Sequence, residues 1–150
     1  MNLQPRDPDF ESRVRASFVR QRFMATLGAS LERVVPGEVT IAFTHRDELT
    51  QQHGFLHAGV MTSVADSACG YAALSLMEPG AGVLSVEFKV NMLAPATGAR
   101  FVATGRVVRA GRTLIVCTGE VTADRDGEPV SVMLMQATMM AVRGKAGVAD

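Results

Sequence analysis

The chain of 150 residues contains no tryptophan, and aromatic residues make up only 5% of it. Proteins that bind single-stranded nucleic acid stack bases on aromatic side chains, so this scarcity argues against that role. An excess of either charge is also missing, because fifteen basic residues balance fifteen acidic ones. A neutral chain has no bulk attraction for nucleic acid or for an anionic membrane surface. We therefore expect no nucleic acid and no membrane among its partners.

Cysteine is scarce as well, and both cysteines, Cys69 and Cys117, lie in apolar runs. Two cysteines do not form the disulfide framework of a small secreted protein, so we expect buried free thiols. The first residues, Met1 to Asp7, lack the charged-then-apolar order of a signal peptide. The sequence thus predicts a cytoplasmic protein, and its length fits a single domain spanning residues 1–150.

The most informative stretch runs from Val60 to Met77 and leaves almost no polar face. A helix that is apolar all round is normally buried. Its Ala, Gly, Ser and Thr content and the central Asp66 argue for burial in protein rather than in a membrane. A buried carboxylate is costly unless it is paired or used. Asp66 is therefore either a satisfied core carboxylate or a functional group.

The loop before this helix offers a site for negative charge. His57, Ala58 and Gly59 lie where the helix begins. Backbone N–H groups at a helix start have no acceptor within the helix, and the helix dipole favours an anion there. The oxyanion formed during acyl transfer is such an anion.

His57 and Asp66 lie nine residues apart. On one helix this spacing corresponds to about 13 Å of rise and roughly half a turn of rotation. The two side chains therefore cannot easily meet on one small reacting group. If both serve one site, a second copy of the chain supplies one of them, which predicts an active site shared across a symmetric homodimer. Whether dimers pair again into a homotetramer is left open.

The remaining pattern predicts an α+β fold, an antiparallel sheet wrapped around one long central helix. Asp7-Pro8 suits a helix start, so a first helix is expected from about residue 8 to 27, ended by Gly28. In the third predicted strand, residues 83–93, Leu84, Val86 and Phe88 alternate with Ser85 and Glu87, which places the two sets on opposite faces. The tail, about 144–150, is predicted to be disordered. Strands are expected at 29–35, 39–44, 83–93, 99–109, 113–123 and 129–143.

This order and its motifs resemble the hotdog fold and, more narrowly, the PaaI-type acyl-CoA thioesterases. The resemblance covers about residues 29–142. The family pattern is Asn, a short gap, Gly-x-x-His-Gly-Gly, then Asp nine residues after the His. The matching stretches here are Gln51…Gly54-Phe55-Leu56-His57-Ala58-Gly59…Asp66, Ser85 to Pro95, Gly111-Arg112-Thr113-Leu114 and Asp126-Gly127.

The resemblance implies a role for each matching position. Asp66 would be the general base toward water or the nucleophile on the thioester. The N–H of Ala58, with Gly59 beside it, would hold the oxyanion, while His57 would shape the loop and bond the thioester region or the neighbouring chain. In some members a serine at the position of Ser85 helps to place the water. The loop of one subunit would face the Asp of the other.

Two departures from the family pattern stand in the loop. Gln51 replaces the Asn that orients water or substrate, and it keeps the amide on a longer side chain; Gln52 is a competing candidate. Ala58 replaces a Gly, which keeps the N–H but adds a methyl group beside the thioester. Related thioesterases also carry Gln, so the resemblance still implies hydrolysis of acyl-CoA to free acid and CoA.

Substrate contacts are predicted at two further places. Arg109 and Arg112, flanking Gly111, are candidates for the CoA phosphates, although a solvated hairpin tip explains them equally well. Phe55 and Leu56 are candidates for the wall of the acyl slot. Methionines offer a flexible lining, although such residues are more often plain core; they are Met61, Met92, Met133, Met135, Met139 and Met140.

No cofactor and no metal are expected, because His45, His53 and His57 do not form a convincing ligand set. A hotdog dehydratase would need a Glu in the central helix, and none precedes Glu78. The alternative from another class is a non-catalytic acyl-CoA sensor. The stretch before the first strand is too short for a helix-turn-helix domain, but a binding-only role stays open because of Gln51 and Ala58.

Overall fold

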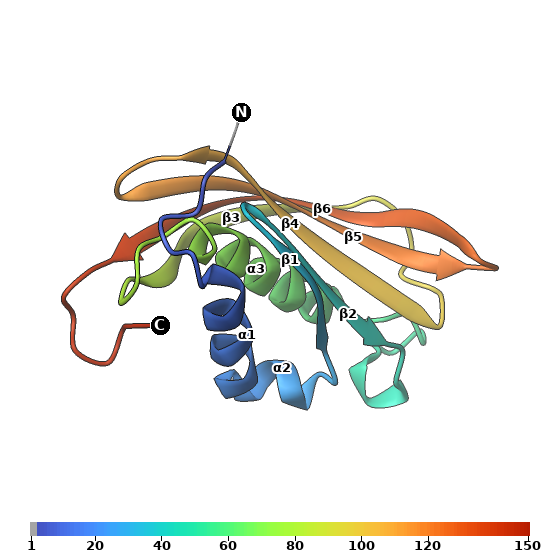
Figure 1. Cartoon of the computed structure of the whole chain (residues 1–150). Coiled ribbons are helices and arrows are strands. Elements are labelled where there is room, and N and C mark those ends of the chain that lie inside the picture. The colour runs from blue at the N-terminus through green and yellow to red at the C-terminus, as the bar shows by residue number, and fades with distance from the viewer. Residues whose placement is uncertain (1–2) are drawn as a thin grey trace.

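The computed structural model describes residues 3–150 and has the predicted order of a helical segment, two strands, a long helix and four strands (Figure 1). Its elements are α1 (Phe10–Arg20), α2 (Arg22–Thr26), β1 (Ser30–Val35), β2 (Glu38–Thr44), the short helix η1 (Asp47–Leu49), α3 (Ala58–Leu74), β3 (Gly82–Met92), β4 (Arg100–Ala110), β5 (Leu114–Arg125) and β6 (Glu128–Val142).

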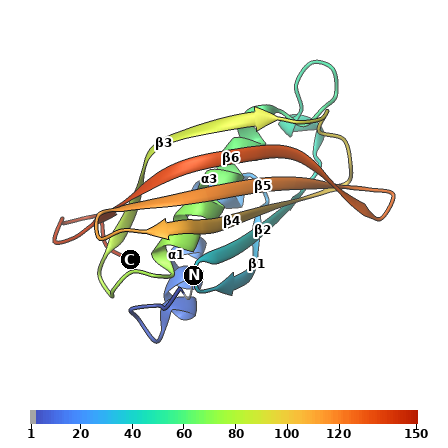
Figure 2. The same cartoon turned by 90° about the horizontal axis from the view of Figure 1, so that it is seen from above.

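The strands form one antiparallel sheet in the order β1-β2-β4-β5-β6-β3 (Figure 2). The sheet curves over α3, and α1 packs on the other side of that helix (Figure 1). This arrangement confirms the predicted α+β architecture. The hydrophobic core lies between α3 and the concave face of the sheet, where inward residues of β4, β5 and β6 such as Phe101, Val121 and Met133 are fully buried.

Two strands carry glycine where they meet helix α3, which lets the helix lie close to the sheet. A Cβ atom at Gly105 would lie 2.3 Å from the backbone carbonyl carbon of Ala68. At Gly119 the same atom would lie 3.1 Å from the Cys69 sulfur. Side chains at these positions would push the helix away, so the glycines set the depth at which Asp66 lies.

The first helix is not continuous, and the prediction of one helix over about 8–27 is wrong at Gln21. There the backbone leaves the helical region, with φ −79° and ψ 89°, and the chain turns into α2. The turn lets Met24 and Leu27 reach the core, where they are 1% and 4% exposed. It also directs the Gln21 side chain toward α3.

Strand β3 contains a bulge that the simple alternation missed. Its pairing with β6 shifts between Ser85 and Glu87, so Val86 is an extra residue. Ser85 is opposite Met139, and Phe88 is opposite Ala137. Met139 and Ala137 are buried against α3, whereas Glu87 is opposite the outward Thr138. Ser85 and Phe88 therefore share the inner face, and the predicted placement of Ser85 on the face opposite to Phe88 is wrong.

The last residues, 144–150, follow a defined path back toward α1. A Cβ atom at Gly82 would lie 3.0 Å from Val148, and the Asp150 carboxylate accepts hydrogen bonds from Ser17 and Arg20, both at 2.6 Å. This placement differs from the predicted disorder of the tail. Among the described residues, no helix combines the length and the apolar character that crossing a bilayer would require.

Candidate active site

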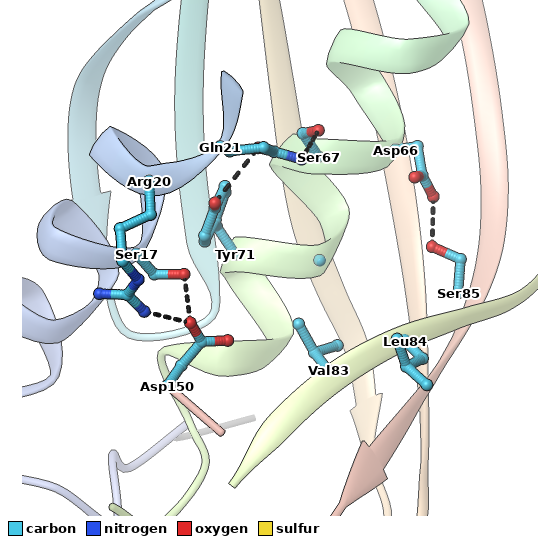
Figure 3. Close-up of a pocket in the computed structure, with 11 residues that line it drawn as sticks. Ser17, Arg20, Gln21, Asp66, Ser67, Tyr71, Val83, Leu84, Ser85 and Asp150 are labelled. Atoms are coloured by element: carbon cyan, nitrogen blue, oxygen red, sulfur yellow. Dashed lines mark hydrogen bonds and ion pairs between the residues drawn. The ribbon is translucent and has the colours of Figure 1, made fainter. Parts of the chain in front are cut away.

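A pocket of about 380 Å³ opens beside Asp66, between α3, the start of β3, α1 and the tail (Figure 3). Asp66 lies near the middle of α3, on the side that the sheet leaves uncovered, and its side chain is half-buried. The residues that line the pocket are Ser17, Arg20, Gln21, Asp66, Ser67, Gly70, Tyr71, Val83, Leu84, Ser85 and Asp150.

Among residues 3–150, Asp66 has one hydrogen-bond partner. The Ser85 hydroxyl donates to Asp66 Oδ1 at 2.7 Å (Figure 3). The β3 bulge makes this contact available, because it turns Ser85 inward beside Met139. With one oxygen oriented by Ser85, the other carboxylate oxygen is open toward the pocket and can accept a proton from a bound water. Ser85, which the resemblance implied would help to place the water, thus lies within hydrogen-bond distance of Asp66.

Six polar side chains of the pocket were missed from the sequence: Ser17, Arg20, Gln21, Ser67, Tyr71 and Asp150. Three of them bond to one another. Tyr71 donates its hydroxyl to Gln21 Oε1 at 3.2 Å, and Gln21 Nε2 donates to Ser67 Oγ at 3.2 Å. The Tyr71 ring is held by Phe18 in an edge-on contact, with 5.8 Å between the ring centroids. Tyr71 lies five residues after Asp66 and was a visible signal in an otherwise apolar run, but nothing in the sequence joined it to Gln21.

The backbone N–H groups at the start of α3 are less free than the sequence suggested. The His57 N–H donates to the Leu49 carbonyl at 2.9 Å, and the Gly59 N–H donates to His57 Nδ1 at 2.8 Å. His57 is thus the N-cap residue, and with Nδ1 as acceptor a neutral ring carries its proton on the exposed Nε2. In the described chain, the Ala58 N–H alone among these three has no acceptor.

The loop that carries Gln51 is held by its own hydrogen bonds. The Gln51 N–H donates to the Phe55 carbonyl at 2.9 Å, and its side-chain Oε1 accepts from the His53 N–H. This leaves the amide NH₂ of Gln51 as the group that it can offer to a ligand. Gln52 is exposed and contacts His53 Nε2 at 3.3 Å.

The two predicted walls of the acyl slot differ in position. Phe55 is exposed on the loop, whereas Leu56 is 2% exposed and belongs to the core of its own chain. Leu56 therefore packs the loop against the sheet rather than lining an open slot. Four of the six methionines are core residues as well: Met61, Met133, Met135 and Met139.

Arg109 and Arg112 lie at the exposed tip between β4 and β5. Neither takes part in an ion pair within the described part of the chain. Gly111 forms the turn by donating its N–H to the Leu114 carbonyl at 3.0 Å, and a Cβ atom there would lie 2.4 Å from that oxygen. The tip lies at the end of the sheet where β3 begins, opposite to the Gln51 loop.

The sequence-predicted residues thus fall into two groups that one chain does not bring together. Asp66 and Ser85 line the pocket, whereas Gln51, His57, Ala58 and Gly59 are absent from its lining. The loop lies at the start of α3, about two helical turns from Asp66. Within residues 3–150, no three His, Cys, Asp or Glu side chains gather into a metal-binding cluster.

Comparison with known proteins identifies the family. The family model of the thioesterase superfamily matches residues 53–130, just over half of the chain and including the loop, α3 and β3 to β5. The chain belongs to this superfamily. The resemblance to PaaI-type hotdog thioesterases, inferred from the Gln51–Asp66 motif, is thereby confirmed, and so is the hotdog fold.

Solved thioesterase structures share this fold over nearly the whole chain. A thioesterase family protein from Silicibacter pomeroyi is 54% identical, with a TM-score of 0.89 over 90% of this chain and 99% of that one. The PaaI protein of E. coli, from the phenylacetic acid degradation operon, has a TM-score of 0.81 at 20% identity, over 91% of this chain and 96% of that one. At that identity the likeness concerns the fold alone.

Sequence relatives extend over less of the chain. Human acyl-coenzyme A thioesterase 13 is 28% identical over 120 residues, which cover 79% of this chain and 85% of that protein. Two proteins of Saccharolobus solfataricus named as esterases are each 33% identical, and the matched regions span 59% and 64% of their lengths. The chain thus spans less than two thirds of the length of those two relatives.

Proposed function

We propose that the protein hydrolyses acyl-CoA thioesters to a carboxylic acid and CoA, and that a second copy of the chain completes each active site. The observation that carries this proposal is the Asp66 carboxylate, which is bonded to Ser85 at 2.7 Å and opens into a pocket in a member of the thioesterase superfamily. The name of the human relative, an acyl-coenzyme A thioesterase, supports the same substrate class.

In the proposed reaction Asp66 accepts a proton from a water molecule whose oxygen attacks the thioester carbonyl carbon. The carbonyl oxygen becomes an oxyanion, which accepts a hydrogen bond from the Ala58 N–H of the partner subunit. The carbon–sulfur bond then breaks, and the proton held by Asp66 passes to the CoA sulfur. Gln51 of the same loop offers its amide NH₂ to the water or to the carbonyl oxygen. Direct attack by Asp66 on the carbonyl carbon would use the same groups.

The exposed edge of β3 supports a shared site. Beside Asp66, apolar side chains of this strand are open to solvent in the single chain: Leu84 is 41% exposed, Val86 52% and Phe88 46%. An exposed edge strand with apolar side chains can pair with the same strand of another copy. Such pairing would cover Asp66 and bring the Ala58 loop of the second copy toward it. The spacing of His57 and Asp66 led us to expect that the loop and the carboxylate of one site come from two subunits.

An assay of CoA release tests the function. Purified protein is incubated with a panel of acyl-CoAs of differing length and ring content, and free CoA is detected with a thiol reagent. We expect turnover by the wild type and a loss of at least about 100-fold in kcat for Asp66→Asn, because the general base is removed. Asp9→Asn, which changes an exposed carboxylate outside the pocket lining, serves as the matched control and should retain activity.

Each outcome has a distinct meaning. Turnover that Asp66→Asn retains within a few-fold would contradict the Asp66 mechanism. Binding of acyl-CoA by calorimetry without turnover across the panel would favour the non-catalytic sensor. Circular dichroism of each variant shows whether the fold is kept.

A further inference from the structure

The tail of the chain, residues 144–150, forms one end of the pocket beside Asp66. After β6 the chain turns back toward α1 (Figure 1). Asp150 is the tail residue that lines the pocket, and it lies away from Asp66 and Ser85 (Figure 3). The tail therefore closes the end of the pocket that is remote from the proposed site of hydrolysis.

A side chain, rather than strand pairing, holds the tail in this position. Asp150 Oδ1 accepts hydrogen bonds from Ser17 Oγ and Arg20 Nη2, each at 2.6 Å. Within the described residues, one backbone hydrogen bond joins the tail to the rest of the chain, from the Gly80 N–H to the main-chain oxygen of Asp150 at 3.3 Å. The Arg20 side chain is 59% exposed, and ion pairs of exposed side chains contribute little because water screens them. The tail is thus held by contacts that a modest change can release.

The distance from Ser85 to the tail corresponds to a chain of defined length. Val148 packs on Gly82, where a Cβ atom would lie 3.0 Å from the Val148 side chain. Gly82 precedes Ser85 by three residues on β3, which corresponds to about 10 Å of strand. An extended carbon chain advances about 1.2 Å per bond, so about eight bonds span this distance.

Solvent lies beyond the tail, because Lys145, Ala146, Gly147 and Ala149 are all exposed. An acyl group with its carbonyl carbon beside Ser85 and more than about eight carbons therefore has two options. It leaves its end in water, which forfeits hydrophobic burial, or it displaces the tail, which breaks the hydrogen bonds of Asp150.

We propose that the tail limits the length of the acyl group that the Asp66 pocket accepts, and that Asp150 is the positioning residue that holds the tail closed. This inference rests on the thioester hydrolysis proposed above. With Asp150 on Ser17 and Arg20, the pocket favours acyl groups of about eight carbons or fewer. With the tail released, the pocket opens between α1 and β3 and admits longer chains. The cost of displacing the tail falls on long substrates alone, so discrimination arises in kcat/KM.

Charge reversal tests the hold of Asp150. The measured quantity is the ratio of kcat/KM for hexanoyl-CoA to that for dodecanoyl-CoA, and we expect about 10 or more for the wild type. Asp150→Arg and Arg20→Asp each place like charges together, so each should lower the ratio by about 5-fold or more. The double variant Asp150→Arg/Arg20→Asp restores opposite charges and should return the ratio to within about twofold of the wild type.

Trypsin cleavage after Lys145 reports release of the tail without reference to turnover. Cleavage requires the residues around Lys145 to leave the surface, so its rate follows the population of the open form. We expect each single reversal to raise the rate by about 5-fold or more, and the double variant to return it toward the wild-type value. Mass spectrometry identifies the product by the loss of residues 146–150.

The variants separate release of the tail from damage to the fold. Asp150→Arg changes the tail alone, so it remains informative if Arg20→Asp destabilises α1. Glu128→Arg makes the same change of charge at an exposed position outside the pocket lining, and it should keep the wild-type ratio and the wild-type cleavage rate.

Failure of the inference differs from failure of the proposed function. A wild type that does not prefer hexanoyl-CoA, a ratio that the single reversals leave unchanged, or a lowered ratio that the double variant does not restore overturns the inference and leaves hydrolysis in place. Faster cleavage after Lys145 with an unchanged ratio has the same meaning. No CoA release from either substrate overturns the inference, and absence of turnover across the wider panel overturns the proposed function as well.

Discussion

At Ala58 a single substitution can remove the backbone N–H that the loop is proposed to offer to the oxyanion, while the loop itself is kept. It is the first residue of α3, where an N–H has no partner within the helix. Its neighbours His57 and Gly59 use their N–H groups inside the chain. His57 has φ −66° and ψ 136°, a conformation that a following proline tolerates. Proline is also favoured at the first position of a helix.

We therefore expect Ala58→Pro to fold normally and to lose about 10²- to 10³-fold in kcat, because the proposed oxyanion donor is absent. Thermal unfolding should show a Tm close to that of the wild type. Ala58→Ser, which keeps the N–H, is the control and should remain active. Wild-type turnover by the proline variant would exclude this N–H as the oxyanion donor.

The two cysteines illustrate how burial lowers the reactivity of a thiol. Cys69 and Cys117 are fully buried and not joined in a disulfide. Burial raises the pKa of both thiols, that of Cys117 to about 12. Because the thiolate is the reactive form, almost none is present at neutral pH.

We predict that neither thiol reacts with a chromogenic disulfide reagent in the native protein at pH 7 to 8, and that both react after unfolding in guanidinium chloride. The same property keeps the CoA-release assay free of background from the enzyme. Rapid labelling of the native protein would show that the core around α3 opens far more readily than its packing implies.

Among the elements, the end of α3 is secured by one side chain from α1. Arg13 donates from Nη2 to the carbonyls of Leu74 and Met77, at 3.0 and 2.7 Å, and from Nη1 to that of Glu78 at 2.5 Å. Its Nε lies 3.3 Å from Asp7 Oδ2 in an ion pair that lacks hydrogen-bond geometry. Arg13 thus satisfies carbonyls that the helix end leaves unpaired.

We expect Arg13→Met to lower the free energy of unfolding by about 2–4 kcal/mol, because buried carbonyls and the Asp7 carboxylate lose their partner. Urea unfolding measures the change. Arg15→Met, which breaks only an exposed pair with Glu11, should cost at most about 0.5 kcal/mol. Equal effects of the two substitutions would show that Arg13 does not secure α3.

For the whole molecule, the two edge strands of the sheet differ in how strongly they discourage pairing with another strand. Strand β1 is short, has a bulge between Leu31 and Arg33, and carries charged residues there, all features that discourage pairing. Strand β3 has eleven residues, and its exposed side chains include Val86 and Phe88. The β3 edge, beside Asp66, is therefore the edge at which a homodimer is expected.

Complementation between inactive variants tests whether two subunits share each site. Asp66→Asn and Ala58→Pro, co-expressed with different tags, should regain about a quarter of wild-type activity, since half of the dimers are mixed and each has one intact site. A site contained within one chain would give no recovery. Adding Phe88→Glu to both variants should abolish the recovery and yield monomers in sedimentation, because a charge then lies on the β3 edge.

Much of the fold and half of the site could be predicted because the signals are local. The apolar run after His57 required a buried helix, and the lone carboxylate at Asp66 marked the face of that helix that lines the candidate site. The His57–Asp66 spacing indicated that these groups do not meet within one chain, and the structure separates them in the same way. Helix periodicity and strand alternation depend on neighbouring residues, so they can be read without coordinates.

The remainder depends on contacts between segments far apart in the chain. The bulge at Val86 arises from pairing with β6 and turns Ser85 toward Asp66, against the alternation of its own strand. The bend at Gln21 lets α2 bury Met24 and joins Gln21 to Tyr71, fifty residues away. Local preference would favour a regular strand and a continuous helix at these points. Packing onto α3 outweighed both preferences, and it thereby shaped the pocket.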